Sequence, residues 1–436
     1  MKLVKSLLLG SAAGFAAVAG AQAADLPMKK AAPVEYVRVC STHGAGFFYI
    51  PGTDTCIRIG GRVRAEYRYQ EPLWSVPGNG RNVDAIGFRA RGRLNVDART
   101  STAYGTLRAF FRYELTSNTG VYGGNSARLD KAFIQWAGIT AGATASFFDF
   151  YADDLNWSTG PLAGFGSDNG TTNLLAYTAT FGSGFSATLS LEDRNQRTVQ
   201  GAGFANYAQA GERVPDVVAA LRVDQGWGSA QLSGAVHQLN STNIGAGFVG
   251  AGVGSGALGS RSDTEYGFAV QGGVKVNLPQ LAPGDVLWLQ AAYADGALNY
   301  LGVGSGTTIG ALTGTATDGV LVNGDIKKTK GWNVTAAFQH YWTPSIRQAL
   351  FGTYTSIDFS SSTVAATTIG GVPALRDFKV YSIGSNLIWS PVSAFDIGVE
   401  VLYSKLDPSG RVAVAPGRTR GSEDVWEARL RLQRDF

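Results

Sequence analysis

The sequence predicts an all-β protein, a transmembrane antiparallel β-barrel, from three observations. Segments of about ten residues alternate between apolar and polar side chains from residue 56 onward. Glycine accounts for 58 of the 436 residues, only 16% of the residues are charged, and the mean hydropathy is close to zero. The links between segments alternate between short turns and long loops, a regularity that soluble β-sandwiches seldom show.

The first segment, residues 56–70, shows the alternation most clearly. Successive side chains of a strand point to opposite faces, so one face of this segment is apolar and the other is charged. The apolar face carries Ile57, Ile59, Val63, Ala65, Tyr67 and Tyr69, and the charged face carries Arg58, Arg62, Arg64, Glu66 and Arg68. A barrel with lipid outside and water inside accommodates both faces.

About sixteen segments have the length that a tilted membrane strand requires. They are residues 56–70, 85–99, 103–115, 128–137, 140–148, 173–181, 185–193, 215–224, 228–240, 263–276, 285–295, 330–342, 346–358, 377–389, 394–406 and 423–436. Outward aromatic residues near segment ends predict a girdle at the membrane interfaces: Tyr67, Tyr69, Trp288, Trp332, Tyr341, Trp342, Trp389 and Trp426. An even number of strands places both chain ends on the periplasmic side.

The links fall into two classes, as in outer-membrane barrels with short periplasmic turns and long extracellular loops. Short links are expected at Thr100–Thr102, Gly138–Ile139, Gly182–Gly184, Gln225–Trp227, Thr343–Ser345 and Ser390–Ser393, with a longer one at 277–284. Long links are expected at 71–84, 116–127, 149–172, 194–214, 241–262, 296–329, 359–376 and 407–422. The glycine-rich stretch 245–256 lacks the Lys-Ser/Thr ending of a phosphate-binding loop, which favours a surface loop.

Residues 1–23 have the features of a secretory signal peptide. Lys2 and Lys5 form the positive region, an apolar stretch follows, and Ala21-Gln22-Ala23 is the cleavage motif. We therefore expect residues 24–55 to form a periplasmic lead-in and residues 56–436 to form one barrel. Without the two lysines the formal charge falls from +4 to +2, which argues against nucleic acid as a partner.

The two cysteines, Cys40 and Cys56, are expected to form a structural disulfide because the signal peptide directs the chain to an oxidising compartment. Such a bridge closes a loop of about 15 residues and stabilises by about 3 kcal/mol on chain-entropy grounds. The alternative, a reactive thiol or a metal pair, lacks a histidine or acidic cluster at ligand spacing. We expect no metal and no cofactor.

Three blocks of sequence resemble the porin family of alphaproteobacteria, which includes the Brucella and rhizobial general porins. The first runs from Ala24-Asp25-Leu26-Pro27 through residues 34–40 and 44–61, the second is Lys131–Gly138, and the third is Gln433–Phe436. The resemblance implies a sixteen-stranded barrel in the bacterial outer membrane, a homotrimer, passive diffusion of small hydrophilic solutes, and a third loop folded into the lumen. It also implies contact with outer-membrane lipid and lipopolysaccharide, and recognition of terminal Phe436 by the barrel-assembly machinery; Arg434 departs from that signal.

Two features are candidates for the pore constriction, where diameter and charge set selectivity. The first is a basic wall at inward positions of the first three strands: Arg58, Arg62, Arg64, Arg68, Arg89, Arg91, Arg93, Arg99, Arg108 and Arg112. The second is loop 149–172, which carries Asp149, Asp153, Asp154 and Asp168. Charges that face each other across water would orient solutes in a transverse field. The alternatives are that the arginines merely solvate the wall and that the loop is an external excursion.

A diffusion porin is the function that the sequence favours. A barrel lipase or protease needs a histidine with an acidic partner, and none of His43, His237 and His340 has an evident one in the sequence. A substrate-specific channel would differ by saturable flux, and a structural or adhesive barrel by the absence of conductance.

Overall fold

The computed structural model describes residues 38–71, 84–151, 155–157, 171–200, 211–241, 264–309, 312–322, 325–369, 372–415 and 418–436. The chain divides into two compact units, residues 1–56 and 57–436. The signal peptide predicted at residues 1–23 lies outside the described residues. Within the described part of the chain, no helix is long and apolar enough to cross a bilayer.

The described part of the N-terminal unit is a small disulfide-closed loop. It contains the 3-10 helix η1 (Ser41–His43) and the short strand β1 (Phe48–Tyr49), and Phe48 forms an isolated bridge with Val39. Cys40 and Cys56 are joined, as predicted. Phe47 is buried beside the two cysteines, which gives this unit a small apolar core of its own.

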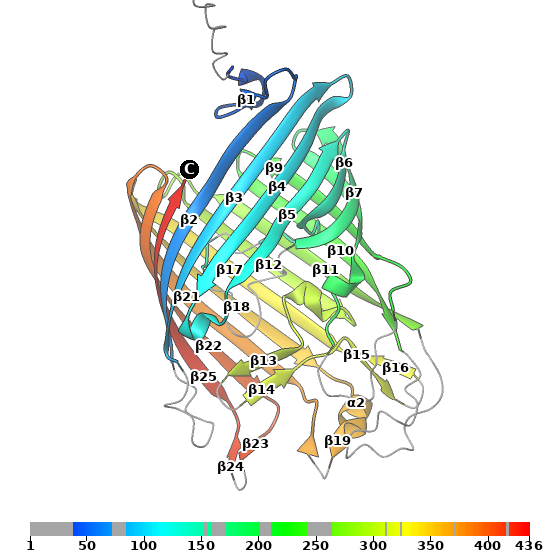
Figure 1. Ribbon diagram of the computed structural model, residues 1–436. Helices are drawn as coiled ribbons and strands as arrows, with labels where there is room; N and C mark the ends of the chain where they lie inside the picture. Colours follow the sequence, from blue (N-terminus) through cyan, green and yellow to red (C-terminus); the bar gives the residue numbers. More distant parts are fainter. Residues whose placement is uncertain are drawn as a thin grey trace, which may run out of the picture. The chain divides into compact units, whose positions relative to one another are not determined.

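The second unit is a closed antiparallel barrel (Figure 1). Sixteen of the described strands form the barrel. These are β2 (Cys56–Gln70), β3 (Ile86–Thr102), β4 (Gly105–Asn118), β5 (Ser126–Trp136), β6 (Ile139–Ala145), β7 (Thr171–Gly182), β8 (Phe185–Glu192), β9 (Asp216–Gln225), β10 (Gly228–Asn240), β11 (Thr264–Asn277), β12 (Val286–Asp295), β17 (Lys330–Thr343), β18 (Ile346–Asp358), β21 (Phe378–Val392), β22 (Phe395–Pro408) and β25 (Glu423–Asp435).

The barrel closes where β2 pairs with β25, from Arg62 opposite Asp435 to Gln70 opposite Glu427. Gly61 and Phe436 extend this pairing, since each backbone N–H donates to the other residue's carbonyl oxygen. A Cβ atom at Gly61 would lie 2.4 Å from the Arg93 carbonyl oxygen and 2.6 Å from the Phe436 ring, so only glycine fits there.

The predicted strands agree closely with the observed ones, and the differences lie at their ends. β3 continues through Thr102, so the short link expected at Thr100–Thr102 is instead the turn at residues 103 and 104. The segment expected to end at residue 148 ends at Ala145, because the chain turns into the lumen after it. Ala137 and Gly138 both have positive φ, which is the two-residue turn that hairpin twist favours.

The long loops carry structure that the sequence did not predict. They contain η2 (Gly120–Tyr122), η3 (Arg194–Gln196), η5 (Leu298–Leu301), β13 (Gly306–Ile309), β14 (Leu312–Thr315), β15 (Gly319–Val322), β16 (Asp325–Lys328), α2 (Ser361–Ala366), β19 (Thr368–Ile369), β20 (Val372–Pro373), β23 (Val412–Ala415) and β24 (Arg418–Arg420). The hairpins β13–β14, β15–β16 and β23–β24 lie at one end of the barrel with α2, and the short turns lie at the other end (Figure 1). An apolar cluster that includes Phe148, Leu298 and Leu312 packs these loops together.

Exposure confirms which parity faces outward. Val63 and Tyr67 on β2 are about half exposed, whereas Glu66, which points to the opposite face of the same strand, is 1% exposed. The girdle residues Tyr67, Tyr69, Trp332, Trp342, Trp389 and Trp426 are all exposed. Trp288 was expected on the outer face and is instead 5% exposed on the inner face.

Candidate functional site: the lumen wall and the inward segment

Arginines line the inner face of β2, β3, β4, β5 and β25, which we call the arginine wall. Cross-strand pairing brings Arg62, Arg64 and Arg68 of β2 opposite Asp435, Gln433 and Arg429 of β25. On the next strands Arg93 is opposite Glu114, and Arg99 is opposite Arg108. The sequence-predicted arginines at 62, 64, 68, 89, 91, 93, 99, 108 and 112 therefore gather on one wall, whereas no contact joins Arg58 to it among the described residues.

The arginine wall holds more guanidinium groups than carboxylates. Four carboxylates, those of Glu66, Asp97, Glu114 and Asp130, form ion pairs with nine arginines. The nine are Arg89, Arg91, Arg93, Arg99, Arg108, Arg112, Arg128, Arg429 and Arg431. The shared carboxylates hold the arginines apart, and the wall keeps a surplus of positive charge.

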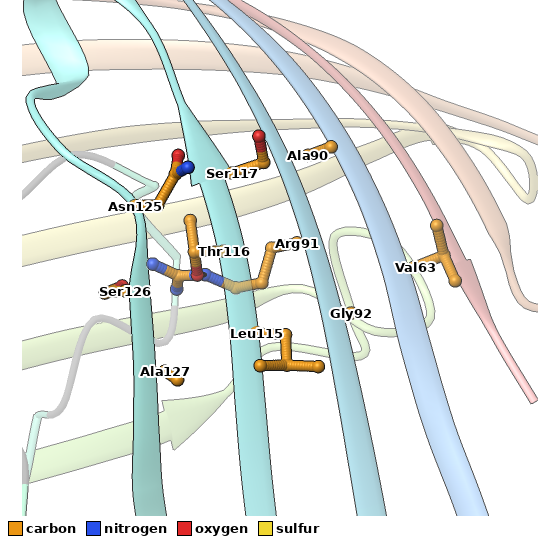
Figure 2. A pocket seen from close by; sticks show the side chains of 10 residues that line it. All are labelled: Val63, Ala90, Arg91, Gly92, Leu115, Thr116, Ser117, Asn125, Ser126 and Ala127. Carbon is orange, nitrogen blue, oxygen red and sulfur yellow. Dashed lines mark hydrogen bonds between the residues drawn. The ribbon is translucent and has the colours of Figure 1, made fainter.

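Several of these arginines use Nε to reach neutral acceptors on the neighbouring strand. Arg89 donates to Asn118 Oδ1 at 2.9 Å, and Arg91 donates to Thr116 Oγ1 at 3.0 Å. Figure 2 shows the Arg91 side chain extending from β3 toward Thr116. A neutral anchor fixes the direction of the guanidinium without cancelling its charge.

After β6 the chain turns into the barrel. We call its described residues 146–151 and 155–157 the inward segment, because both stretches contact side chains of the lumen wall. The Phe148 carbonyl oxygen accepts hydrogen bonds from Ser233 Oγ at 2.8 Å and from Gln271 Nε2 at 2.8 Å. The Tyr151 N–H donates to Gln290 Oε1 at 2.9 Å. Neutral side chains of β10, β11 and β12 thus hold this part of the segment.

The other described end of the inward segment reaches β21, β22 and β25. Asn386 Nδ2 donates to the Leu155 carbonyl oxygen at 2.7 Å, and the Trp157 N–H donates to Glu400 Oε2 at 2.7 Å. Arg429 Nη1 donates to the Trp157 carbonyl oxygen at 2.8 Å, and the Arg431 guanidinium lies 4.3 Å from the Trp157 ring centroid. Trp157 therefore contacts the edge of the arginine wall.

Two wall glycines make room for aromatic side chains of the inward segment. A Cβ at Gly273 would lie 2.3 Å from Phe150 Cδ1, and a Cβ at Gly398 would lie 2.6 Å from Trp157 Cη2. Trp288, which was wrongly expected in the outer girdle, packs against Phe150 with ring centroids 5.0 Å apart. The girdle prediction failed here because a tryptophan on the lumen face is expected only where an apolar side chain covers it. The sequence did not reveal that Phe150 covers Trp288.

The acidic residues predicted for this loop have different positions. Asp149 forms an ion pair with Arg197 at 3.0 Å, and both side chains are nearly inaccessible to solvent. Burial opposes the charge of Arg197, but the Asp149 carboxylate raises the pKa of that guanidinium. Asp149 is thus paired with Arg197, in the segment after β8. Asp153, Asp154 and Asp168 lie outside the described residues.

A buried polar cluster fastens the loop between β12 and β17 to the wall. His237 Nδ1 lies 2.8 Å from Asp216 Oδ2, which also accepts from the Tyr300 hydroxyl at 2.8 Å. Asp318 accepts the backbone N–H groups of Val199 and Leu298. Burial raises the pKa of the Asp318 carboxyl and of the Tyr300 hydroxyl.

The expectation that no histidine has an acidic partner is therefore wrong for two of the three. His237 has Asp216, and His340 Nδ1 lies 2.7 Å from Asp285 Oδ2. The partners are distant in sequence, so they could not be found from spacing. His43 lies close to both cysteine sulfurs, but these are bonded to each other and are not thiolate ligands for a metal.

An open cavity of about 570 Å³ lies over β2–β5 (Figure 2). Its lining includes Val63, Ala90, Gly92, Leu115 and Ala127, which occupy outward positions on their strands. Arg91 and Thr116 also belong to the lining, but most lining residues occupy outward positions, so the cavity is a hollow that opens on the outer face behind the arginine wall.

Comparison with known proteins decides the family. The family profile described as "Porin subfamily" matches residues 25–427. The chain belongs to this porin family. It is a multi-pass β-barrel of the bacterial outer membrane, and because porins are channels rather than enzymes, the barrel lipase or protease alternative is excluded.

The relatives agree with the family profile. Porin Omp2b of Brucella suis biovar 1 is 36% identical over 240 residues, and this match covers 52% of the chain and 64% of the relative. A second Omp2b sequence from Brucella suis is 37% identical over 257 residues, with the same coverage. The chain thus spans just under two thirds of the length of the curated relatives it matches.

Solved structures share the fold. The outer membrane channel DcaP of Acinetobacter baumannii aligns with a TM-score of 0.63 and 16% identity, covering 89% of this chain and 99% of DcaP. Pseudomonas putida OprB aligns with a TM-score of 0.51 and 11% identity, covering 87% of this chain and 94% of OprB. At these identities the likeness concerns the fold alone.

Sequence reasoning missed several residues that hold the inward segment. These are Gln271, Gln290, Asn386, Glu400, Arg429 and Arg431. Parity alone places Arg429 and Arg431 on the inner face of the last strand. Their role depends on the pairing of β25 with β2, which brings them beside the first arginines and which local patterns do not reveal.

Proposed function

We propose that the barrel is a water-filled channel for passive diffusion of ions and small hydrophilic solutes. The constriction lies between the arginine wall and loop 149–172. The observation that carries the proposal is the course of the inward segment, which hydrogen-bonds to lumen residues from Ser233 of β10 to Arg429 of β25. A chain segment held across the interior narrows the opening, and in an open barrel the narrowest point sets selectivity.

Charge is the second part of the proposal. The arginine wall has surplus positive charge, and loop 149–172, which carries Asp153, Asp154 and Asp168, supplies the opposing acidic charge in this proposal. Opposed charges across a narrow aqueous gap produce a field that filters ions by a few kT. Asp149 is left out of this set because Arg197 neutralises it.

Planar-bilayer recordings of the whole protein test the proposal. Exchanging Arg62, Arg64, Arg91 and Arg93 together for glutamine should shift the reversal potential in a KCl gradient toward cations, and neutralising Asp153, Asp154 and Asp168 should shift it toward anions. Both shifts should shrink at molar salt, where the Debye length falls to about 3 Å. A deletion within 153–168 should raise conductance. Unmoved reversal potentials together with unchanged conductance would place the constriction elsewhere.

Assembly as a homotrimer is also proposed. The hollow opposite the arginine wall supports it, since Ala90, Gly92 and Ala127 leave the outer face of β3–β5 open to the exposed apolar side chains of another copy. Contacts with outer-membrane lipid, lipopolysaccharide and the barrel-assembly machinery belong to the same proposal. Native mass measurement in mild detergent tests the trimer, and monomers alone would contradict it.

A further inference from the structure

Arg64 differs from its neighbours on the arginine wall. Its Nε and Nη2 atoms donate to Gln433 Oε1, at 3.2 and 3.0 Å. Among the described residues no carboxylate lies within ion-pair distance of Arg64, whereas Arg62 beside it is paired with Asp435. Gln433 therefore fixes the Arg64 guanidinium while leaving its charge uncompensated and its Nη1 atom without a described acceptor.

Arg91 on β3 is the second loosely paired arginine. Its Nε donates to Thr116 Oγ1, and its Nη1 lies 3.6 Å from Glu114 Oε2, beyond hydrogen-bond distance. Glu114 is also held by Arg93 at 2.5 Å and by Arg128 at 3.0 Å, so little of its charge is left for Arg91. Arg64 and Arg91 thus both keep an oriented guanidinium and unused Nη donors.

The two arginines are close enough to act together. β2 pairs with β3, Gly61 lies against the Arg93 backbone, and Glu66 forms an ion pair with Arg89, so Arg64 and Arg91 lie across from each other on neighbouring strands. The charged groups that surround Arg64 are Arg431, Glu66, Arg62 and Arg91. Three of these four carry the same charge as Arg64, and Glu66 is shared among Arg89, Arg429 and Arg431. Like charges gathered with so few carboxylates are stabilised when an anion binds between them.

We infer that Arg64 and Arg91 form a binding subsite for doubly charged oxyanions, such as dicarboxylates and phosphate. This rests on the proposed channel function and deepens it, because it names a class of solute that the lumen wall would bind during passage. The planar fork of a guanidinium matches the oxygens of a carboxylate or a phosphate. Two fixed forks need two negative charges, so a doubly charged ligand fits better than chloride or a monocarboxylate.

Calorimetric titration of the full protein in detergent at low salt tests the subsite without relying on conductance. Succinate and inorganic phosphate distinguish carboxylate from phosphate sources, and acetate is the singly charged control. Both dianions are expected to bind saturably and acetate much more weakly. Equal binding of acetate and succinate, or no saturable binding, would overturn the inference.

Variants separate the subsite from the general field. Arg64→Gln should weaken succinate binding about tenfold, the loss expected for one charge-assisted hydrogen bond. The matched control is Arg222→Gln, which removes the same charge from β9, where Arg222 is already paired with Asp224 at 2.7 Å. Binding should be unchanged in this control, and an equal loss in both variants would overturn the subsite.

Arg64→Lys separates charge from geometry. Lysine keeps the positive charge and loses the fork, so succinate binding should weaken while the reversal potential in KCl stays as in the parent protein. Parent-like succinate binding in this variant would overturn the forked subsite. Ohmic conductance with no saturable succinate binding would leave the proposed function intact and overturn the subsite alone. Saturable succinate binding with no conductance would overturn the proposed function and leave the subsite intact.

Discussion

The two halves of the barrel wall use polar side chains in opposite ways. The arginine wall of β2–β5 and β25 carries clustered charges. The wall of β10–β12 and β17–β21 carries neutral groups on the same inward parity, including Gln271, Gln290, Asn333, Thr335 and Asn386. The neutral wall is the one that holds the Phe148 and Leu155 carbonyl oxygens of the inward segment.

The difference shows how a barrel can hold a segment inside itself. Buried backbone groups of the inward segment need hydrogen-bond partners, and amide or hydroxyl side chains supply these without burying a charge. The guanidinium groups of the arginine wall on β3 and β4 stay partly exposed to the lumen, whereas Arg429 and Arg431 beside Trp157 are nearly buried. The neutral wall supplies hydrogen-bond partners for the inward segment, and the arginine wall supplies the charge that faces the lumen. One barrel can therefore hold an internal segment and still present charge to solutes.

The largest expected effect comes from filling the two glycine positions that accommodate aromatic rings of the inward segment, Gly273 on the neutral wall and Gly398 on β22 beside the arginine wall. Gly273→Val and Gly398→Val should displace Phe150 and Trp157, because even a Cβ at these positions lies within 2.6 Å of a ring. Overpacking of this kind costs about 1–3 kcal/mol, enough to unseat the segment. Single-channel conductance should rise or fluctuate between levels. Gly272→Val, at a position open to solvent or lipid, is the control, and equal behaviour of all three variants would argue against a seated segment.

The next effect tests the charge asymmetry directly. Glu114→Gln removes a carboxylate shared by Arg91, Arg93 and Arg128, so it should shift the reversal potential toward anions. Gln290→Leu on the neutral wall removes the acceptor of the Tyr151 N–H and should alter loop stability without this shift. Reversal potentials measured at low and at molar salt compare the two variants. A shift of equal size in both would erase the distinction between the walls.

The outer faces of the two halves should differ in assembly. Gly92→Trp fills the hollow behind the arginine wall, where a side chain on this glycine would meet open space within one copy, and should dissociate trimers without unfolding the barrel. Gly272→Trp places the same bulk on β11 behind the neutral wall, with equal room in the monomer. Native mass spectrometry measures the oligomeric state of both variants. Trimers that persist with Gly92→Trp would move the interface to other strands.

The smallest effect on the channel is expected from the disulfide, which belongs to neither wall. Cys40→Ser removes a bridge between residues of the N-terminal unit. The free energy of unfolding should fall by roughly 3 kcal/mol, the stabilisation that closing a loop of this length provides, and the assembly yield should fall with it. Conductance and reversal potential should stay as in the parent protein. A marked change in either would mean that the bridge supports the lumen after all.

Much of the barrel could be predicted from sequence because lipid and water impose a period of two on every strand. The segments 56–70, 228–240 and 346–358 have the observed bounds, and the arginines of β2–β4 point inward as parity requires. Parity is a local property, so it is readable without knowledge of the fold.

The contacts of the inward segment could not be predicted in this way. The partner of Asp149 is 48 residues away, and Glu400 binds a backbone N–H 243 residues away. Trp288 was misplaced because its covering residue, Phe150, comes from another part of the chain. Such contacts depend on which loops enter the lumen, which alternation within a strand does not encode.

The closure of the barrel has a kinetic consequence. Arg62 of β2 pairs with Asp435 of β25, which lies 373 positions later in the sequence. Until β25 has been delivered, the edge of β2 presents unpaired N–H and C=O groups to any other strand, which invites aggregation. Contacts of such long range slow folding, so the rate of productive closure should depend on how well the β2 edge is shielded while it waits.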